Sequence, residues 1–169
     1  MNALLFLIGL AVAGQELPWR ATMVTRDEPG DALIVSGTVY ARDGRTALAG
    51  ARVRIYHTDA SGLYSRDGSS EDKPRLQAIL QTNDHGQYQV RTIVPGAYPG
   101  QRTTAAHIHI MVSVAGGVEQ NATFSLAGDP RLTNDDYQRH AQSGTFSAIR
   151  PIERAADGVF RCVRDIRLR

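Results

Sequence analysis

Short alternating stretches of apolar and polar residues characterise the chain from Ala32 onward. Apolar and β-branched residues fill 33–40, and a strict alternation follows over 51–56. Similar stretches cover 87–93 and 107–114, with turn-forming Gly and Asp residues between them. A two-residue period interrupted by turns is typical of β-strands that bury one face. The pattern therefore predicts a strand-rich domain.

The C-terminal stretch 158–168 predicts one more strand. Within it, Ile166 and Leu168 alternate with Arg167 and Arg169. Alternate residues of a strand point to opposite faces, so the two arginines share a face. We expect that face to be solvated, and a binding patch is the alternative interpretation.

A helical signal lies near 134–142, where Thr133 is a candidate N-cap. Strands without long helices bury their apolar faces by packing sheet on sheet. The expected fold is therefore all-β, an antiparallel β-sandwich formed by a single domain over residues 32–169. A short N-terminal arm over residues 15–31, which shows no sustained period, would precede it.

Length, charge and cysteine content narrow the function classes. The chain has 169 residues, enough for one well-packed domain, and its formal net charge is +2. Its cations are almost all arginine, but they form no dense basic block of the kind that binds phosphate backbones. Nucleic acid is therefore not expected as a partner. A lone Cys162 excludes an intrachain disulfide, and its apolar neighbours predict a buried, unreactive thiol.

Residues 1–14 form an apolar run that ends in small residues. This pattern predicts a cleavable export signal and a secreted or periplasmic protein. Asn2 stands where a basic residue is usual, so an uncleaved anchor or a buried N-terminal segment is the alternative. Polar Gln15 and Glu16 end the run before the roughly 20 apolar residues that a membrane-spanning helix needs. No stable membrane insertion is expected once the signal is removed.

Two histidines are the sharpest chemical signal. His107 and His109 stand two residues apart in a predicted strand, so their side chains point to the same face about 7 Å apart along it. Both imidazoles could then reach one metal ion. A His-x-His pair alone is more often a surface or hydrogen-bonding pair, so a metal site needs further donors.

Two tyrosines lie on turns and loops ahead of the histidines. Tyr98 stands between Pro95-Gly96 and Pro99-Gly100, which restrict the loop that leads to the histidine strand. Tyr64 follows an Asp/Ser/Gly turn after the strand over 51–56. Taken singly, each tyrosine is more often a core or rim residue than a ligand.

A series of short motifs occurs in order from about Val35 to Asp136. They are Gly37-Thr38-Val39, Gly50-Ala51-Arg52-Val53, Tyr56-His57-Thr58-Asp59, Gly62-Leu63-Tyr64, Thr82-Asn83-Asp84-His85-Gly86-Gln87-Tyr88, Arg91-Thr92-Ile93-Val94-Pro95-Gly96-Ala97-Tyr98-Pro99 and Ala106-His107-Ile108-His109. No single motif is specific. Their ordered combination resembles the intradiol ring-cleavage dioxygenases, the family of protocatechuate 3,4-dioxygenase, of the exported, stand-alone type.

The resemblance implies a site and a reaction. In that family two tyrosines and two histidines hold a ferric ion, and the motifs place these roles on Tyr64, Tyr98, His107 and His109. An Fe(III) dioxygenase that opens catechol-type rings with O2, between the two hydroxyl-bearing carbons, is therefore implied, with Tyr98 leaving the metal and returning as a base. Phenolate oxygen suits Fe(III), a hard cation whose charge would lower a tyrosine pKa from its usual value of about 10.

Two positions depart from the family pattern. Thr104 stands where an arginine is usual, three residues before the first ligand histidine, and Arg102 is the nearest replacement as a catalytic residue. Thr123 stands where a glutamine is usual. Groups around a metal tune its substrate, so these departures bear on rate and specificity more than on iron binding.

A second hypothesis is a β-sandwich binding module, catalytically weak or inactive, that keeps the fold and perhaps the metal site. The two departures favour it, whereas the four retained ligand positions favour the enzyme. Of the other histidines, His57 is expected at the rim or in a hydrogen bond, and His85 and His140 in solvent. The sequence does not determine which catechol is the substrate, and a homo-oligomer would leave no mark in it.

Overall fold

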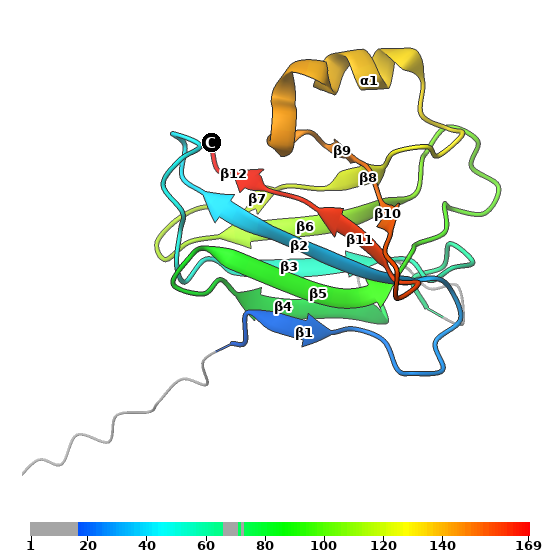
Figure 1. The fold of residues 1–169 in the computed structure, drawn as a ribbon, viewed down its shortest axis with the longest axis horizontal. Coiled ribbons are helices and arrows are strands. Elements are labelled where there is room, and N and C mark those ends of the chain that lie inside the picture. The colour runs from blue at the N-terminus through cyan, green and yellow to red at the C-terminus, as the bar shows by residue number, and fades with distance from the viewer. Residues whose placement is uncertain (1–16, 66–70, 72) are drawn as a thin grey trace, which may run out of the picture.

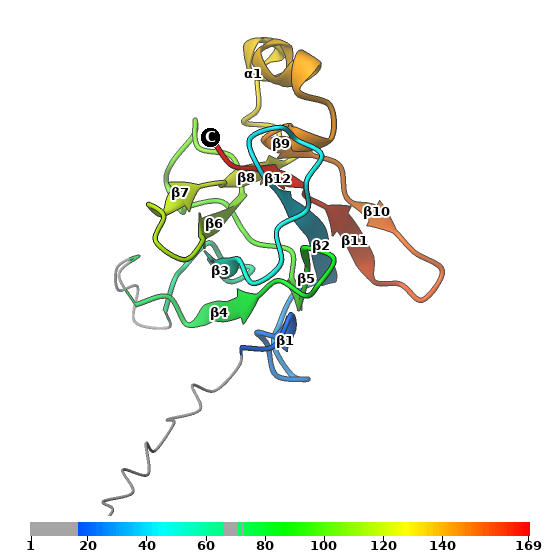
Figure 2. The same ribbon diagram turned by 90° about the vertical axis from the view of Figure 1, so that its left-hand side faces the viewer.

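The computed structural model describes residues 17–65, 71 and 73–169, so the predicted export signal lies outside the described residues. Two β-sheets pack face to face, with a short helix beside them (Figures 1 and 2). The predicted all-β sandwich is confirmed. The expected N-terminal arm is not wholly irregular, because β1 (Arg20–Thr22) lies within it and pairs in parallel with β5 (Gln87–Ile93).

The first sheet has the strand order β1-β5-β2-β11-β10, and β12 also pairs with β2. Its centre is the antiparallel pair β2 (Ala32–Tyr40) and β5 (Gln87–Ile93), which match the strands predicted at 33–40 and 87–93. Three short strands from the C-terminal part complete it: β10 (Glu153–Arg154), β11 (Phe160–Val163) and β12 (Ile166–Arg167).

The C-terminal stretch differs from the prediction of one strand over 158–168. It is divided into β11 and β12, which both run parallel to β2, so the sandwich is not wholly antiparallel. At the break, the carboxylate of Asp165 accepts the Thr38 N–H at 3.0 Å in place of a backbone carbonyl. The Arg164 carbonyl turns over Gly37, where a Cβ would meet its oxygen at 2.0 Å. A glycine and a side-chain acceptor therefore interrupt the ladder.

Tyr88 holds the break in place. Its hydroxyl, buried in the core, donates to the Arg164 carbonyl oxygen at 2.7 Å. We expect Tyr88→Phe to lower the free energy of unfolding by about 1–3 kcal/mol, because it leaves a buried carbonyl without a donor. Urea unfolding would measure this. The matched control is Tyr40→Phe, because the Tyr40 hydroxyl has no hydrogen-bond partner among the described residues. Equal losses of stability in both variants would contradict the role given to the Tyr88 hydrogen bond.

The second sheet has the order β4-β3-β6-β8-β9, with β7 paired to β6. β3 (Arg52–His57) and β6 (His107–Ser113) are antiparallel and match two predicted strands. Four further strands had not been predicted: β4 (Leu76–Gln81), β7 (Gln120–Asn121), β8 (Phe124–Leu126) and β9 (Ile149–Arg150).

The helix α1 (Asn134–His140) is the one expected near 134–142. Thr133 caps it as predicted, since its side-chain oxygen accepts the Asp136 N–H. A 3₁₀ segment, Ala141–Phe146, follows. Figure 1 shows both outside the two sheets, near β8 and β9. No helix in the described part of the chain is long and apolar enough to cross a membrane.

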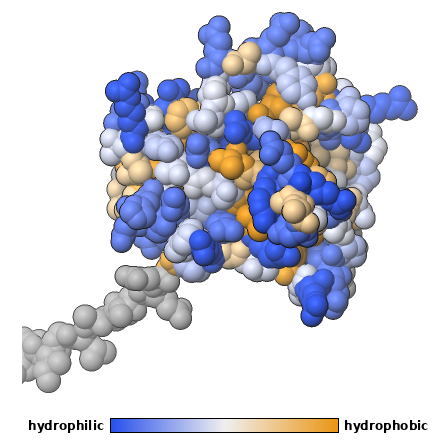
Figure 3. Space-filling model, in the orientation of Figure 1, coloured by the Kyte–Doolittle hydropathy of each residue, from blue (hydrophilic) through white to orange (hydrophobic). Residues whose placement is uncertain are grey.

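Alternation along β6 places the core residues on one face of the strand and the two candidate ligand histidines on the other. Ile108, Ile110 and Val112 are fully buried between the sheets, whereas His107 and His109 point to the opposite face and are partly exposed. Polar and intermediate residues cover most of the molecular surface seen in Figure 3, with smaller apolar areas among them. The histidines thus lie on the outer face of the second sheet and do not interrupt the apolar core.

Candidate metal centre

The four predicted ligands meet at one point. The Tyr64 hydroxyl lies 2.5 Å from the Tyr98 hydroxyl and 2.9 Å from His109 Nε2. The Tyr98 hydroxyl lies 3.1 Å from His107 Nε2, and the two Nε2 atoms are 3.0 Å apart. The structure therefore brings the two imidazoles and the two phenols together, and their binding of one metal ion stays a prediction. We call Tyr64, Tyr98, His107 and His109 the tetrad.

Hydrogen bonds tie the two tyrosine-bearing loops together. The Thr58 hydroxyl donates to the Gly96 carbonyl at 2.7 Å, and the Gly96 N–H donates to the Asp59 carbonyl at 2.9 Å. Gly62, in the left-handed region at φ +82°, packs against the second loop so closely that a Cβ would lie 2.0 Å from the Ala97 carbonyl oxygen. The β3–β4 loop therefore positions Tyr64 against the β5–β6 loop that carries Tyr98.

Arg75 anchors the end of the Tyr64 loop. Its N–H donates to the Tyr64 carbonyl at 2.8 Å, and its guanidinium bonds both Glu28 carboxylate oxygens, at 2.6 and 2.8 Å. A longer contact of 3.4 Å reaches Asp59. The Glu28 bond raises the pKa of Arg75, so this cation is held in its charged form. The sequence pattern had not indicated this support for the loop.

The protonation states of the histidines leave nitrogen lone pairs facing the tetrad. His107 Nδ1 lies 2.8 Å from the Ala105 carbonyl, which can only accept, so Nδ1 carries the hydrogen and Nε2 presents a lone pair. Burial, with a further effect of the His107 charge, lowers the pKa of His109 to about 4. His109 is therefore neutral near pH 7, the form in which an imidazole binds a metal.

The donor set fits a hard, multivalent cation. Burial raises the pKa of both Tyr64 and Tyr98, so neither phenol ionises readily without a compensating positive charge. A metal of high charge would supply that compensation and turn the phenols into phenolates. Among the described residues, His, Cys, Asp and Glu alone form no group of three or more that could hold a metal, so the two tyrosines are essential to such a site.

Comparisons with known proteins identify the family of this chain. The sequence profile of the family described as "Dioxygenase" matches residues 11–169. The catechol 1,2-dioxygenase of Acinetobacter baylyi is 33% identical over 135 residues, which are 70% of this chain and 43% of that protein. Catechol 1,2-dioxygenase 2 of Acinetobacter lwoffii is 31% identical over 141 residues, 75% of this chain and 50% of that protein. The chain belongs to the intradiol ring-cleavage dioxygenase family.

Solved structures of intradiol dioxygenases share the fold. Catechol 1,2-dioxygenase from Pseudomonas arvilla C-1 superposes with a TM-score of 0.70 at 26% identity, over 94% of this chain and 59% of that one. The dioxygenase domain of a carbohydrate-binding fusion protein from Streptomyces sp. SirexAA-E gives 0.67 at 24% identity, over 92% and 90% of the two chains. This chain spans about half the length of the curated relatives it matches.

Two residues beside the tetrad were not predicted as part of the site. The Tyr56 ring stacks on His109 with centroids 4.5 Å apart and planes 4° apart, because the two residues are cross-strand partners. The Tyr56 hydroxyl donates to Glu71 at 2.9 Å, and the same carboxylate oxygen lies 3.4 Å from His109 Nε2. Burial and the Glu71 bond raise the pKa of Tyr56 to about 12. The pairing of β3 with β6 is the signal that could have found Tyr56.

The two departures from the intradiol pattern lie at different distances from the tetrad. Arg102 is exposed and makes no hydrogen bond or ion pair in the described part of the chain, so its catalytic role stays a prediction. The Thr104 hydroxyl bonds Gln101 at 2.9 Å, also in the exposed loop. Thr123 lies against the centre, with its hydroxyl 3.4 Å from His109 Nδ1. The glutamine position therefore borders a tetrad histidine, whereas the arginine position points elsewhere.

His57 is buried, not at the rim as one expectation had it. It is 0% exposed, and its Nδ1 lies 2.6 Å from the Thr58 carbonyl, so Nδ1–H donates there. Its Nε2 lies 2.6 Å from the Thr92 hydroxyl and, having no hydrogen of its own, accepts a hydrogen bond from that hydroxyl. Burial lowers the pKa of His57 to about 4. The expected hydrogen-bonding role of His57 is confirmed. The residue lies where the loop that carries Tyr64 begins.

Stability should therefore fall in mild acid. Between pH 6.5, the ordinary His pKa, and about pH 4, the unfolded chain protonates His57 and the folded chain does not. The free energy of unfolding is expected to decrease by about 3 kcal/mol across this window and to be unaffected by His57 above it. Urea unfolding from pH 7.5 to 4.5 measures the slope.

The His57→Gln variant isolates this contribution, because His109 titrates in the same pH window in the wild type and in the variant. The variant should show a flatter pH dependence. The control His85→Gln changes a histidine exposed in a turn and should follow the wild type. Parallel curves for wild type and His57→Gln would show that burial of His57 is not the cause.

Proposed function

We propose that this intradiol family member is a non-haem Fe(III) dioxygenase that uses O2 to open catechol-type rings between their two hydroxyl-bearing carbons. The observation that carries the proposal is the convergence of two phenol oxygens and two imidazole nitrogens, each of which lies 2.5–3.1 Å from two of the others. The catechol 1,2-dioxygenase names of its relatives support the reaction class.

The tetrad would hold the metal. Two phenolates would balance two of the three positive charges of Fe(III), and the neutral imidazoles would complete the protein ligands. When bound, Fe(III) would supply Lewis acidity toward a catechol substrate.

The chain's own residues would then orient ligands and move protons. Carbonyl bonding at Nδ1 fixes the His107 ring, and the Tyr56 stack fixes the His109 ring while covering one of its faces. As a phenolate, Tyr98, which the family pattern marks as the ligand that leaves, would accept one proton from a catechol hydroxyl and become a neutral phenol. The Tyr64 loop, tied to Asp59 and Arg75, would keep the other phenol in place.

A binding module with little or no turnover is the second candidate. One observation favours it: the arginine expected beside the substrate is replaced by Thr104, and Arg102 is exposed and makes no hydrogen bond or ion pair among the described residues. A cation near the reacting ring would otherwise stabilise negative charge that develops there.

Visible spectroscopy with oxygen measurement separates the two candidates. The purified chain is loaded with Fe(III), and its spectrum is recorded before and after adding catechol in air, together with O2 uptake and product analysis. The enzyme proposal expects a broad tyrosinate-to-iron band that shifts with catechol and then bleaches, with one O2 consumed for each ring opened to a dicarboxylic acid. A stable shifted band without O2 uptake supports the binding module. A colourless protein that retains no iron would overturn the enzyme proposal and would leave only a binding module without a metal.

A further inference from the structure

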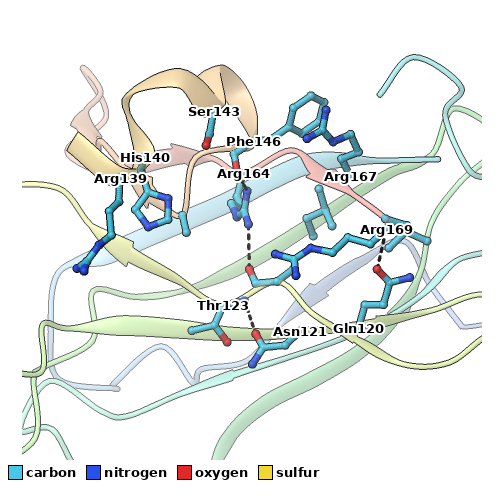
Figure 4. A pocket seen from close by; sticks show the side chains of 14 residues that line it. Gln120, Asn121, Thr123, Arg139, His140, Ser143, Phe146, Arg164, Arg167 and Arg169 are labelled. Atoms are coloured by element: carbon cyan, nitrogen blue, oxygen red, sulfur yellow. Dashed lines mark hydrogen bonds between the residues drawn. The ribbon is translucent and has the colours of Figure 1, made fainter. Parts of the chain in front are cut away.

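A basic pocket, lined by none of the four tetrad residues, lies near the C-terminal segment. It is a cavity of about 570 Å³ between residues 120–123, which include β7, the end of α1, the 3₁₀ segment and residues 164–169 (Figure 4). Its lining includes Arg164 and both members of the predicted arginine row, Arg167 and Arg169. No Asp or Glu side chain lines it among the described residues. Arg167 and Arg169 are exposed, as expected for a solvated face, and they also border this pocket.

Arg164 is a buried cation at the pocket. It is 6% exposed, and its guanidinium bonds only backbone carbonyls: those of Phe146 at 2.9 Å, Asp165 at 2.8 Å and Ala122 at 3.3 Å. Its Nε has no hydrogen-bond partner, and none of the ion pairs among the described residues includes it. A buried charge without a counter-ion is costly, so an anion in the adjoining space would be stabilised.

The arginine row adds positive charge at the mouth of the pocket. Arg167 places its guanidinium 5.2 Å from the centre of the Phe146 ring. The Arg169 N–H donates to Gln120 at 2.7 Å, which fastens the C-terminal segment to β7. In Figure 4 the Arg169 side chain extends across the pocket. Neither guanidinium has a carboxylate partner in the described part of the chain, whereas Arg139 at the far side is paired with Asp136.

We propose that this pocket is a second ligand site, which binds a small doubly charged oxyanion: a dicarboxylate or a phosphate. Guanidinium groups match the paired oxygens of both anions, and three of them line this pocket without an Asp or Glu ion pair among the described residues. Neutral groups in the lining, including Asn121 and Ser143, offer further hydrogen bonds. Thr123 lines the pocket and also approaches His109 Nδ1 at 3.4 Å, so the site lies directly behind the tetrad.

The proposal does not depend on iron or turnover, and calorimetry on the full chain without added metal tests it. Inorganic phosphate and succinate are titrated separately into wild type at low ionic strength. We expect saturable binding of at least one, which also tells phosphate from dicarboxylate. The double variant Arg167→Gln/Arg169→Gln should bind it about tenfold or more weakly, since both changes remove charge-assisted hydrogen bonds.

The matched control is Arg20→Gln/Arg154→Gln, which removes the same net charge from exposed arginines outside the pocket. Binding by the control should stay within about twofold of wild type. Because Arg167 and Arg169 are exposed, both double variants should fold, and circular dichroism checks this. The proposal is overturned if neither anion gives a saturable isotherm in wild type, or if the control weakens binding as much as the pocket variant.

Discussion

Replacing Tyr64 with phenylalanine is expected to lower Fe(III) affinity about 100-fold or more and to remove the visible band. The Tyr64 hydroxyl contacts two other tetrad atoms, Tyr98 Oη at 2.5 Å and His109 Nε2 at 2.9 Å. Its loss removes one anionic donor from the centre of the cluster, where even outer groups that support a ligand are worth about 10- to 100-fold. Iron retained after desalting, together with the absorption spectrum, measures the effect.

The sharpest control is Tyr56→Phe, a tyrosine of the same site whose hydroxyl bonds Glu71 and not the tetrad. Its ring, stacked on His109, is kept in the variant, so iron affinity should stay within about tenfold of wild type. Equal loss of iron in Tyr56→Phe and Tyr64→Phe would mean that the ligand set is wrong.

The substitution Gly62→Ala is expected to lower the free energy of unfolding by about 3 kcal/mol or more. Its φ of +82° already disfavours any residue with a Cβ by roughly 1–2 kcal/mol. The new Cβ would also lie 2.0 Å from the Ala97 carbonyl oxygen, so one of the two tyrosine loops must move. Because that movement separates Tyr64 from Tyr98, iron affinity should fall together with stability. Urea unfolding and iron retention measure the two effects.

Gly100→Ala separates steric contact from backbone strain. Gly100 has a similar φ of +76° and follows Tyr98 closely, but a Cβ there would meet no atom within 4 Å. We expect a loss of only about 1–2 kcal/mol and unchanged iron retention. If Gly100→Ala were as harmful as Gly62→Ala, the close approach of the two loops would not be what holds the tyrosines together.

The sequence determined the parts of this protein that depend on local periodicity. Alternation along β6 places His107 and His109 on one face and Ile108 and Ile110 on the other, because successive side chains of a strand point in opposite directions. The same reasoning predicted β2, β3 and β5, and the capping chemistry of Thr133 predicted α1. Each of these inferences needs only neighbours along the chain.

The shortest strands were not predicted, because local periodicity cannot show them. β7, β9 and β10 have two residues each, too few for a period to show, and they exist because longer strands offer them hydrogen bonds. The break between β11 and β12 depends on Asp165 reaching Thr38 and on Tyr88 reaching Arg164, contacts between residues distant in sequence.

The tertiary structure alone decided how the site is completed. Tyr56 lies on His109 because β3 pairs with β6 in one particular register, and a slip of one residue would turn it to the core. Burial of His57 and the contact of Gly62 with Ala97 follow from loop packing. The arginine row lines a pocket because the C-terminal segment packs against β7 and the 3₁₀ segment. Periodicity tells which way a side chain points, whereas only packing decides what it meets there.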